Sequence, residues 1–228
     1  MWFPYDKTGR SPAGFVWDGT GGAFGPFGGQ VFVGDQYGAL VNRVFLERVA
    51  GRVQGAVFPF RSGLASGVTR VAFGPDGVLL AGMTDRGWTA LGTRTFGLQR
   101  IAWTGAMPFE LCEMRARADG FELVFTLPVD PASAGDPASY TLASYTYELH
   151  AAYGSDEMDR RALAVERAVV AADRRSVQLF AGGLRAGYVH ELLAPGVRDA
   201  AGAPLLHAQA YYTLAALAEP EGSAAGGD

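Results

Sequence analysis

A short motif at the start of a long predicted loop combines residue types that could bind a sugar. It reads Asp85-Arg86-Gly87-Trp88, and the loop extends to Gly97. An indole ring can stack on the apolar face of a pyranose, while a carboxylate and a guanidinium can bond the sugar hydroxyls. The motif therefore predicts a substrate-binding loop. The structural alternative is a loop fixed by a turn at Asp85–Arg86, with Trp88 buried.

A second polar pair occupies the matching place one predicted repeat earlier. Asp35 and Gln36 directly follow the strand-like run 30–34. Acids at equivalent positions of two repeats would face one central region, where a calcium ion or a sugar could be held. The alternative for this pair is a solvated turn.

Other catalytic chemistry finds little support in the residue pattern. The three histidines, His150, His190 and His207, lie 40 and 17 positions apart, which matches no zinc-site spacing. Cys112 is the only cysteine, so an intrachain disulfide, a cysteine metal site and a c-type haem motif are excluded. The sequence also contains no dinucleotide-binding fingerprint and no phosphate-binding loop. We therefore name no catalytic residue, no metal ligand and no cofactor for this chain.

Composition indicates an all-β protein. The 228 residues include 32 Gly and 12 Pro, and 49% are hydrophobic, which suits many short strands joined by tight turns. A net charge of −4 gives no basic face for nucleic acid. No apolar stretch of membrane-spanning length occurs, and the first residues lack the apolar run of a signal peptide.

The first part of the chain contains what reads as an internal repeat. Two glycine-flanked strands end at Gly34 and Gly82, 48 positions apart, and similar segments follow each. Propeller blades repeat at about this period, so residues 1–106 are predicted to be about two blades of an incomplete β-propeller. A chance match of two strands is the alternative. Two blades cannot close a ring, so an apolar blade face should be left uncovered, and the isolated chain should be poorly soluble or oligomeric.

The pattern changes after residue 106. Residues 121–126 alternate apolar and polar side chains, and further strand-like runs separated by turn residues continue to about 214. About seven strands over this length predict an immunoglobulin-like β-sandwich at 107–217. The remaining residues, 218–228, are small and polar and are predicted to form a disordered tail.

Several segments, in order along the chain, resemble bacterial glucose/sorbosone dehydrogenase-like propeller proteins, many of which carry a cytochrome c or haem-binding domain. The resemblance implies a periplasmic or extracellular protein of which this chain is the C-terminal segment. In a complete parent it further implies pyrroloquinoline quinone with calcium as cofactors and a c-type cytochrome as electron acceptor. The segments that carry it include 24–27, 30–36, 73–77, 84–88, 103–105, 120–123, 153–155, 187–191 and 211–214.

Arg70 is the one candidate suggested by the resemblance itself. In the quinone-dependent members an arginine contacts the cofactor from the corresponding strand, but that position here is Thr69. A slip of one residue places a side chain on the opposite face of a sheet, so Arg70 fits only if a bulge restores the register. Otherwise Arg70 pairs with a backbone carbonyl or a carboxylate.

The functional expectation is therefore a segment of a secreted sugar dehydrogenase-like protein that is not catalytic on its own. Its expected partners are the missing blades, a sugar or polysaccharide, and the cytochrome acceptor. The alternative is a non-catalytic surface module that binds carbohydrate or protein. An upstream extension with a catalytic histidine would favour the first reading.

Overall fold

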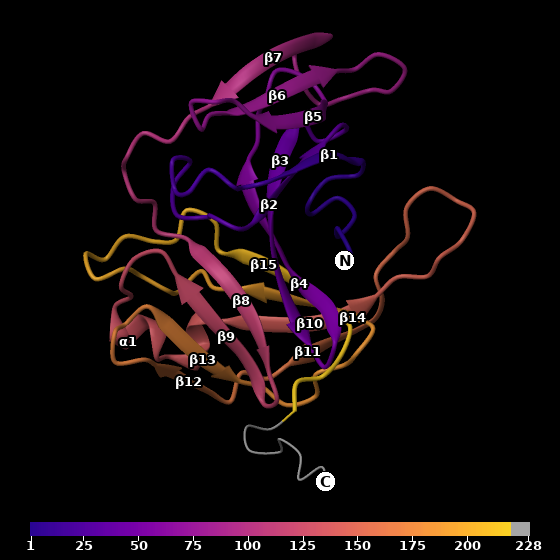
Figure 1. Ribbon diagram of the computed structural model, residues 1–228. Coiled ribbons are helices and arrows are strands. Elements are labelled where there is room, and N and C mark those ends of the chain that lie inside the picture. The colour runs from indigo at the N-terminus through magenta and orange to yellow at the C-terminus, as the bar shows by residue number, and fades with distance from the viewer. Residues whose placement is uncertain (220–228) are drawn as a thin grey trace, which may run out of the picture.

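Fifteen strands and two short helical turns are present in residues 1–219, which are the residues that the computed structural model describes (Figure 1). All strand pairs are antiparallel, and the strands form three sheets. The protein is therefore all-β, as the composition predicts. The tail predicted at 218–228 lies outside the described residues from position 220 onward.

The largest sheet has eight strands and extends through both halves of the chain. Its central hairpin joins two ten-residue strands, and the last strand of the chain pairs with that hairpin along one side. The strands in order across the sheet are β1 (Pro12–Trp17), β2 (Val31–Asp35), β3 (Leu40–Val49), β4 (Arg52–Arg61), β15 (Gln209–Leu214), β14 (Tyr188–Leu193), β10 (Thr141–Thr146) and β11 (Met158–Leu163).

Two smaller sheets cover opposite ends of the large one. A four-stranded sheet faces the second half of it, in the order β12 (Arg167–Val170), β13 (Ser176–Phe180), β9 (Gly120–Phe125) and β8 (Leu111–Arg117). A three-stranded sheet of β5 (Val68–Phe73), β6 (Leu79–Thr84) and β7 (Phe96–Ile101) covers β1 and β2, at the top of Figure 1. The helical turns, α1 (Pro131–Ala134) and the 3-10 turn Pro137–Ser139, connect β9 to β10.

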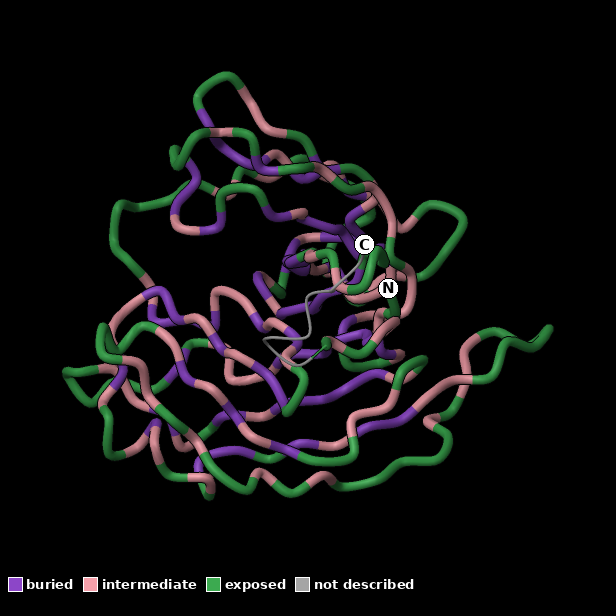
Figure 2. The backbone as a smooth tube through the Cα atoms, turned by 60° about the horizontal axis from the view of Figure 1, so that its bottom comes forward, coloured by how far each residue is buried: buried purple, intermediate pink, exposed green. Residues whose placement is uncertain are grey.

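Each pair of facing sheets encloses its own apolar core, visible as the buried inner faces in Figure 2. Alternation along the strands supplies these cores, because every second side chain points inward. The core of the second half includes Phe45 and Phe58, which come from the β3–β4 hairpin. The core of the first half includes Phe60, from the same hairpin. The hairpin therefore contributes to both cores.

The two-blade propeller predicted for residues 1–106 is not confirmed. The sheets are open, and β3 and β4 continue into the sheet of the second half instead of completing a blade. The two glycines of the supposed repeat also have different surroundings. A Cβ on Gly34 would lie 2.5 Å from the Val68 side chain, so close sheet packing requires glycine there, whereas the nearest atom at Gly82 is 3.7 Å away. The 48-residue spacing therefore does not reflect two equivalent units.

The uncovered blade face expected from that reading is also largely absent. Val71 and Leu79 are buried, because β1 and β2 pack against β5, and Val33 is buried on the other face of the large sheet, in a cluster with Tyr145 and Val189. Apolar side chains do remain exposed elsewhere, among them Phe15 on β1, Phe96 and Leu98 on β7, and Leu149 on the β10–β11 loop. No helix within residues 1–219 is long and apolar enough to cross a membrane.

Candidate functional site

Aromatic side chains from distant parts of the chain gather on one exposed surface. The Tyr153 ring lies 5.9 Å from that of Trp88 and 6.1 Å from that of Tyr5, between ring centroids. Trp88 is 55% exposed and Tyr153 is 61% exposed, so both rings present area to solvent that is not used in the core. We call Tyr5, Tyr37, Trp88 and Tyr153 the aromatic platform.

Arg10 joins the fourth ring to the platform. Its guanidinium lies 4.3 Å from the centroid of the Tyr37 ring and 5.3 Å from that of Tyr5. Asp6 forms an ion pair with the same guanidinium, and this hydrogen bond raises the pKa of Arg10. A cation held between two aromatic rings leaves hydrogen-bond donors beside the apolar ring faces.

The loop that carries Trp88 is fixed by a residue named in the sequence analysis. The side-chain amide of Gln36 donates to the carbonyl of Trp88 at 2.8 Å and to that of Thr84 at 3.3 Å. The Trp88 N–H donates to the Asp85 carbonyl at 3.1 Å, which closes the turn. The two predicted motifs, 35–36 and 85–88, are therefore brought together, with Gln36 positioning the backbone behind Trp88.

Tyr153 is fixed to the N-terminal segment. Its hydroxyl donates to the Arg10 carbonyl at 2.5 Å and lies 2.8 Å from the Ser11 hydroxyl. A Cβ added to Gly154 would lie 3.0 Å from the Tyr5 ring, so the chain passes directly against that ring. These contacts hold the β10–β11 loop, which projects at the right of Figure 1, against residues 5–11.

The N-terminal segment is itself anchored by charge. The Lys7 ammonium lies 2.5 Å from a carboxylate oxygen of both Glu157 and Glu191, and Arg160 pairs with the same two acids at 2.7 and 2.9 Å. Glu191 is buried. Burial raises the pKa of Glu191, but the hydrogen bonds from Lys7 and Arg160 outweigh that effect and leave its pKa lowered.

The other predicted site residues lie in different environments. Asp35 is fully buried, and its carboxylate accepts backbone hydrogen bonds from Ser11 at 2.6 Å and Gly38 at 2.5 Å, so it stabilises a turn instead of reaching the surface. Arg86 is exposed on the Trp88 loop. Arg70 is exposed on β5 and donates to the Thr69 carbonyl at 2.7 Å, the alternative considered for it, and it lies outside the platform.

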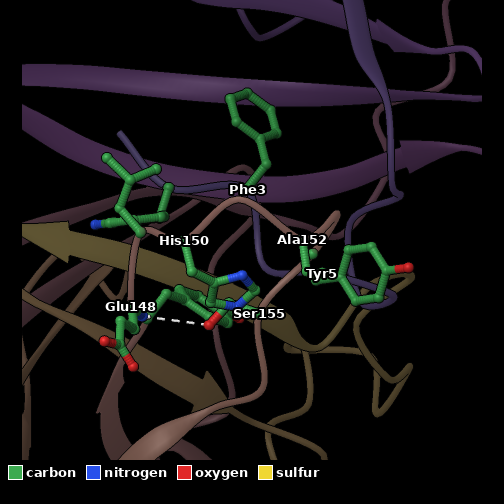
Figure 3. A pocket seen from close by; sticks show the side chains of 10 residues that line it. Phe3, Tyr5, Glu148, His150, Ala152 and Ser155 are labelled. Carbon is green, nitrogen blue, oxygen red and sulfur yellow. Dashed lines mark hydrogen bonds between the residues drawn. The ribbon is translucent and has the colours of Figure 1, made fainter.

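A small pocket adjoins the platform and shares the Tyr5 ring with it. It has a volume of about 210 Å³ and lies between the N-terminal residues and the β10–β11 loop. Figure 3 shows Phe3 and Tyr5 from the first and Glu148, His150, Ala152 and Ser155 from the second. The Glu148 N–H donates to the Ser155 hydroxyl at 3.2 Å, which closes the base of this loop. The platform and the pocket together form a surface with apolar faces and scattered polar groups.

This arrangement suits binding better than catalysis. No cluster of His, Cys, Asp and Glu within residues 1–219 could hold a metal ion. His190 is fully buried and packs against Phe121, away from the platform, and burial lowers its pKa to about 4. His207 pairs with buried Glu110 at 2.8 Å in the other half of the molecule. Besides the Glu148 and His150 side chains of the pocket, the surface offers ring faces, hydroxyls and one guanidinium.

Sequence reasoning missed Tyr5, Arg10, Tyr37 and Tyr153. The available signal was the aromatic run Trp2-Phe3-Pro4-Tyr5, which has no place in a strand of its own. Nothing in the sequence indicated that residues near position 5 would meet residues near position 153, because that contact depends on the large sheet joining both halves.

Comparisons with known proteins return few matches. No family model matches the chain, and no curated protein matches it. Among solved structures, the chain is similar to the N-terminal part of the bacterial S-layer protein SbsC, with TM-score 0.36, 17% identity, and coverage of 47% of this chain and 24% of that one. It is also similar to the S-layer protein rSbsC(31-844), with TM-score 0.35, 18% identity, and coverage of 45% and 13%. The chain therefore spans less than a quarter of the length of these structures.

The resemblance to glucose/sorbosone dehydrogenase-like proteins is wrong. The sheets are open, without propeller blades, and the solved structures to which the chain is similar are S-layer proteins and not sugar dehydrogenases. A sugar dehydrogenase segment and oxidoreductase chemistry therefore have no support. The cytochrome acceptor and the quinone were expected only through that resemblance, and the missing blades depended on the propeller as well.

Proposed function

We propose that this chain is a non-catalytic module that binds a saccharide chain across the aromatic platform. The observation that carries the proposal is the pair Trp88 and Tyr153, two rings that are each more than half exposed and lie 5.9 Å apart. Exposed ring faces are the surface on which the apolar C–H faces of sugar rings stack. The Arg10 guanidinium and the Tyr153 hydroxyl supply polar groups at the edge for sugar hydroxyls.

The rigidity of the two loops supports this proposal. Trp88 is backed by the Gln36 amide, and Tyr153 is tied through its hydroxyl to residues 10 and 11. Ring faces held in place before binding lose little conformational freedom when a ligand arrives. Sugar units could then stack on the exposed rings of Trp88 and Tyr153.

The strand order of the second half supports an immunoglobulin-like classification as part of the same proposal. Its first, second, fifth and sixth strands form one sheet in the order β12-β13-β9-β8, and the third, fourth, seventh and eighth form β11-β10-β14-β15. This matches the ABED and C′CFG sheets of immunoglobulin-like sandwiches. Such sandwiches are common in cell-surface proteins, and we keep the periplasmic or extracellular address as part of the proposal.

Affinity gel electrophoresis tests the function. The full chain is run through gels containing single soluble polysaccharides, among them neutral glucans, mannans and xylans, and the affinity for a retarding polymer is then measured by calorimetry. Trp88→Ala should weaken binding about fivefold or more, since an aromatic contact is worth about 1 kcal/mol or more. Trp17→Ala is the matched control, because Trp17 is also 55% exposed but lies on β1.

Two results would contradict the proposal. One is that none of the polysaccharides retards the chain. The other is that Trp17→Ala weakens binding as much as Trp88→Ala, which would move the ligand away from the platform. Tyr153→Phe separates the role of the ring face from that of the hydroxyl. It keeps the ring and removes the hydroxyl that donates to the Arg10 carbonyl.

A further inference from the structure

Strand β7 is an edge strand with an unusually apolar outer side. It pairs only with β6, so its other edge has no partner among the described strands. Phe96 is 74% exposed and Leu98 is 70% exposed, and both lie on the outer face of the three-stranded sheet. Proteins usually protect such edges with charges, prolines or bulges, because an open edge recruits another strand. Here the single charge on that face of β7 is Arg100, at its far end.

The free backbone groups of β7 can be assigned from two hydrogen bonds. The Asp85 N–H donates to the Thr95 carbonyl at 2.9 Å, and the Thr84 N–H turns the other way, toward the Gly67 carbonyl at 2.8 Å. Backbone groups alternate in direction along an antiparallel strand. Residues 95, 97 and 99 therefore direct their backbone groups to β6, while Phe96, Leu98 and Arg100 present theirs to solvent.

From this pattern we infer that β7 pairs with β7 of a second copy of the chain, antiparallel and symmetric about Leu98. In this register Leu98 faces Leu98 of the other copy, and each Phe96 faces the Arg100 of the other copy. The pair places the Arg100 guanidinium, which pairs with Asp76 of its own chain at 2.7 Å, beside an exposed aromatic ring twice. The outward N–H and C=O groups of the three residues satisfy one another, and two three-stranded sheets become one sheet of six.

The opposite face of β7 accommodates the same register. There Gly97 would face Gln99 of the second copy, and glycine has no side chain to obstruct it. Gln99 is already engaged within its own chain, since its side-chain oxygen accepts the Ala65 N–H at 2.7 Å. A register centred on Gln99 would instead place Leu98 opposite Arg100 of the second copy. Phe96 would then lie beyond Ile101 of the second copy, so the aromatic ring would be separated from the cation.

The experiment has two parts, both on the full chain. Size-exclusion chromatography with light scattering over a wide concentration range should show a species of twice the mass of one chain. Phe96→Lys should convert it to a monomer, because two like charges would enter the contact beside Arg100. Phe15→Lys is the matched control and should stay dimeric, since Phe15 is 75% exposed but lies on β1.

Disulfide formation then tests the register. In a background of Cys112→Ser, which removes the only cysteine, Leu98→Cys should form a homodimeric disulfide under mild oxidation. Facing residues of a hydrogen-bonded pair lie about 5.5 Å apart between Cα atoms, within the range of a disulfide. Phe96→Cys and Arg100→Cys should crosslink when mixed and not singly. A monomer at all concentrations, a dimer that survives Phe96→Lys, or crosslinking in another pattern would each overturn the inference.

Discussion

The guanidinium of Arg43, on β3, donates a hydrogen bond to the backbone carbonyl of Cys112, on β8, at 2.6 Å. It also donates to the Leu111 carbonyl and to the side-chain oxygen of Gln30, and it lies 4.1 Å from the centroid of the Phe27 ring. Burial lowers the pKa of Arg43 to about 10, which leaves it charged at neutral pH. One buried cation thus connects the first half of the chain to the start of the sandwich.

Replacing this arginine should destabilise the whole protein. Arg43→Met removes the donors and leaves the Leu111 carbonyl and the Gln30 side-chain oxygen without these hydrogen bonds, at a cost of about 1–3 kcal/mol each, whereas the Cys112 carbonyl still accepts from the Gln30 amide at 2.9 Å. We expect urea unfolding to show a loss of at least about 2 kcal/mol. Arg70→Met is the control and should stay within about 0.5 kcal/mol, because Arg70 is exposed and bonds only the adjacent carbonyl. Equal effects of the two substitutions would show that the buried contacts are not formed.

The two halves should unfold together. The β3–β4 hairpin contributes side chains to both cores and pairs with β15, so neither half keeps its contacts when the other is lost. All four tryptophans lie before residue 107, so indole fluorescence reports on the first half, whereas far-UV circular dichroism reports on all the strands. The two denaturation curves should coincide. Separate transitions would instead favour two independent domains divided near residue 106, a boundary that stays a prediction.

Local patterns allowed the strands to be predicted, but not their partners. The alternation in 121–126 corresponds to β9. Residues 56–60 also read as a strand-like run, and they lie within β4. Residues 163–170 read as one continuous strand, but they are divided between β11 and β12, which belong to different sheets, because the chain crosses between layers at residues 164–166. Strand pairing across 150 residues, such as β4 with β15, leaves no local signal in the sequence.

In the candidate site too, local residue patterns indicated some of the residues, and contacts between distant segments could not be predicted. Trp88 was selected because an indole on a loop suits sugar binding, and its exposure agrees with that reading. Gln36 was selected for a different reason, and the structure places its amide behind Trp88. Tyr153 could not be predicted, because its place beside Trp88 depends on the folding of the N-terminal segment over the large sheet.

Stability should depend on pH through His190. This residue is fully buried, and burial lowers its pKa to about 4, whereas an unfolded histidine titrates near 6.5. Between these values the unfolded chain binds more protons, so the free energy of unfolding should fall as pH decreases from about 6.5 to about 4, by up to about 3 kcal/mol. Urea unfolding at several pH values measures this.

A matched pair of variants isolates the contribution of that histidine. His190→Gln should flatten the dependence over this range, because glutamine keeps an acceptor for the Arg185 N–H, which lies 3.2 Å from the ring nitrogen, and does not titrate. His150→Gln should leave the dependence unchanged, because His150 is exposed on the β10–β11 loop. A wild-type dependence that persists in His190→Gln would assign it to other groups.

The last prediction concerns the anchor of the N-terminal segment. Glu191 is buried on β14 and accepts from Lys7 and Arg160 at 2.5 and 2.9 Å, so its charge holds residues 1–11 against the sheet. Glu191→Gln should weaken this attachment by about 1.5–3 kcal/mol, the usual value of hydrogen bonds to charged groups. Hydrogen exchange should then accelerate in residues 1–11 and in the β10–β11 loop, while the three-stranded sheet stays protected.

Glu148→Gln is the control, because that side chain lines the pocket without forming an ion pair in the described structure, and it should leave exchange unchanged. Since Tyr5 and Arg10 belong to the released segment, Glu191→Gln should also weaken saccharide binding without altering any ring of the platform. Unchanged exchange at residues 1–11 in Glu191→Gln would show that the aromatic contacts of Tyr5 and Tyr153, and not the buried charge, hold the segment in place.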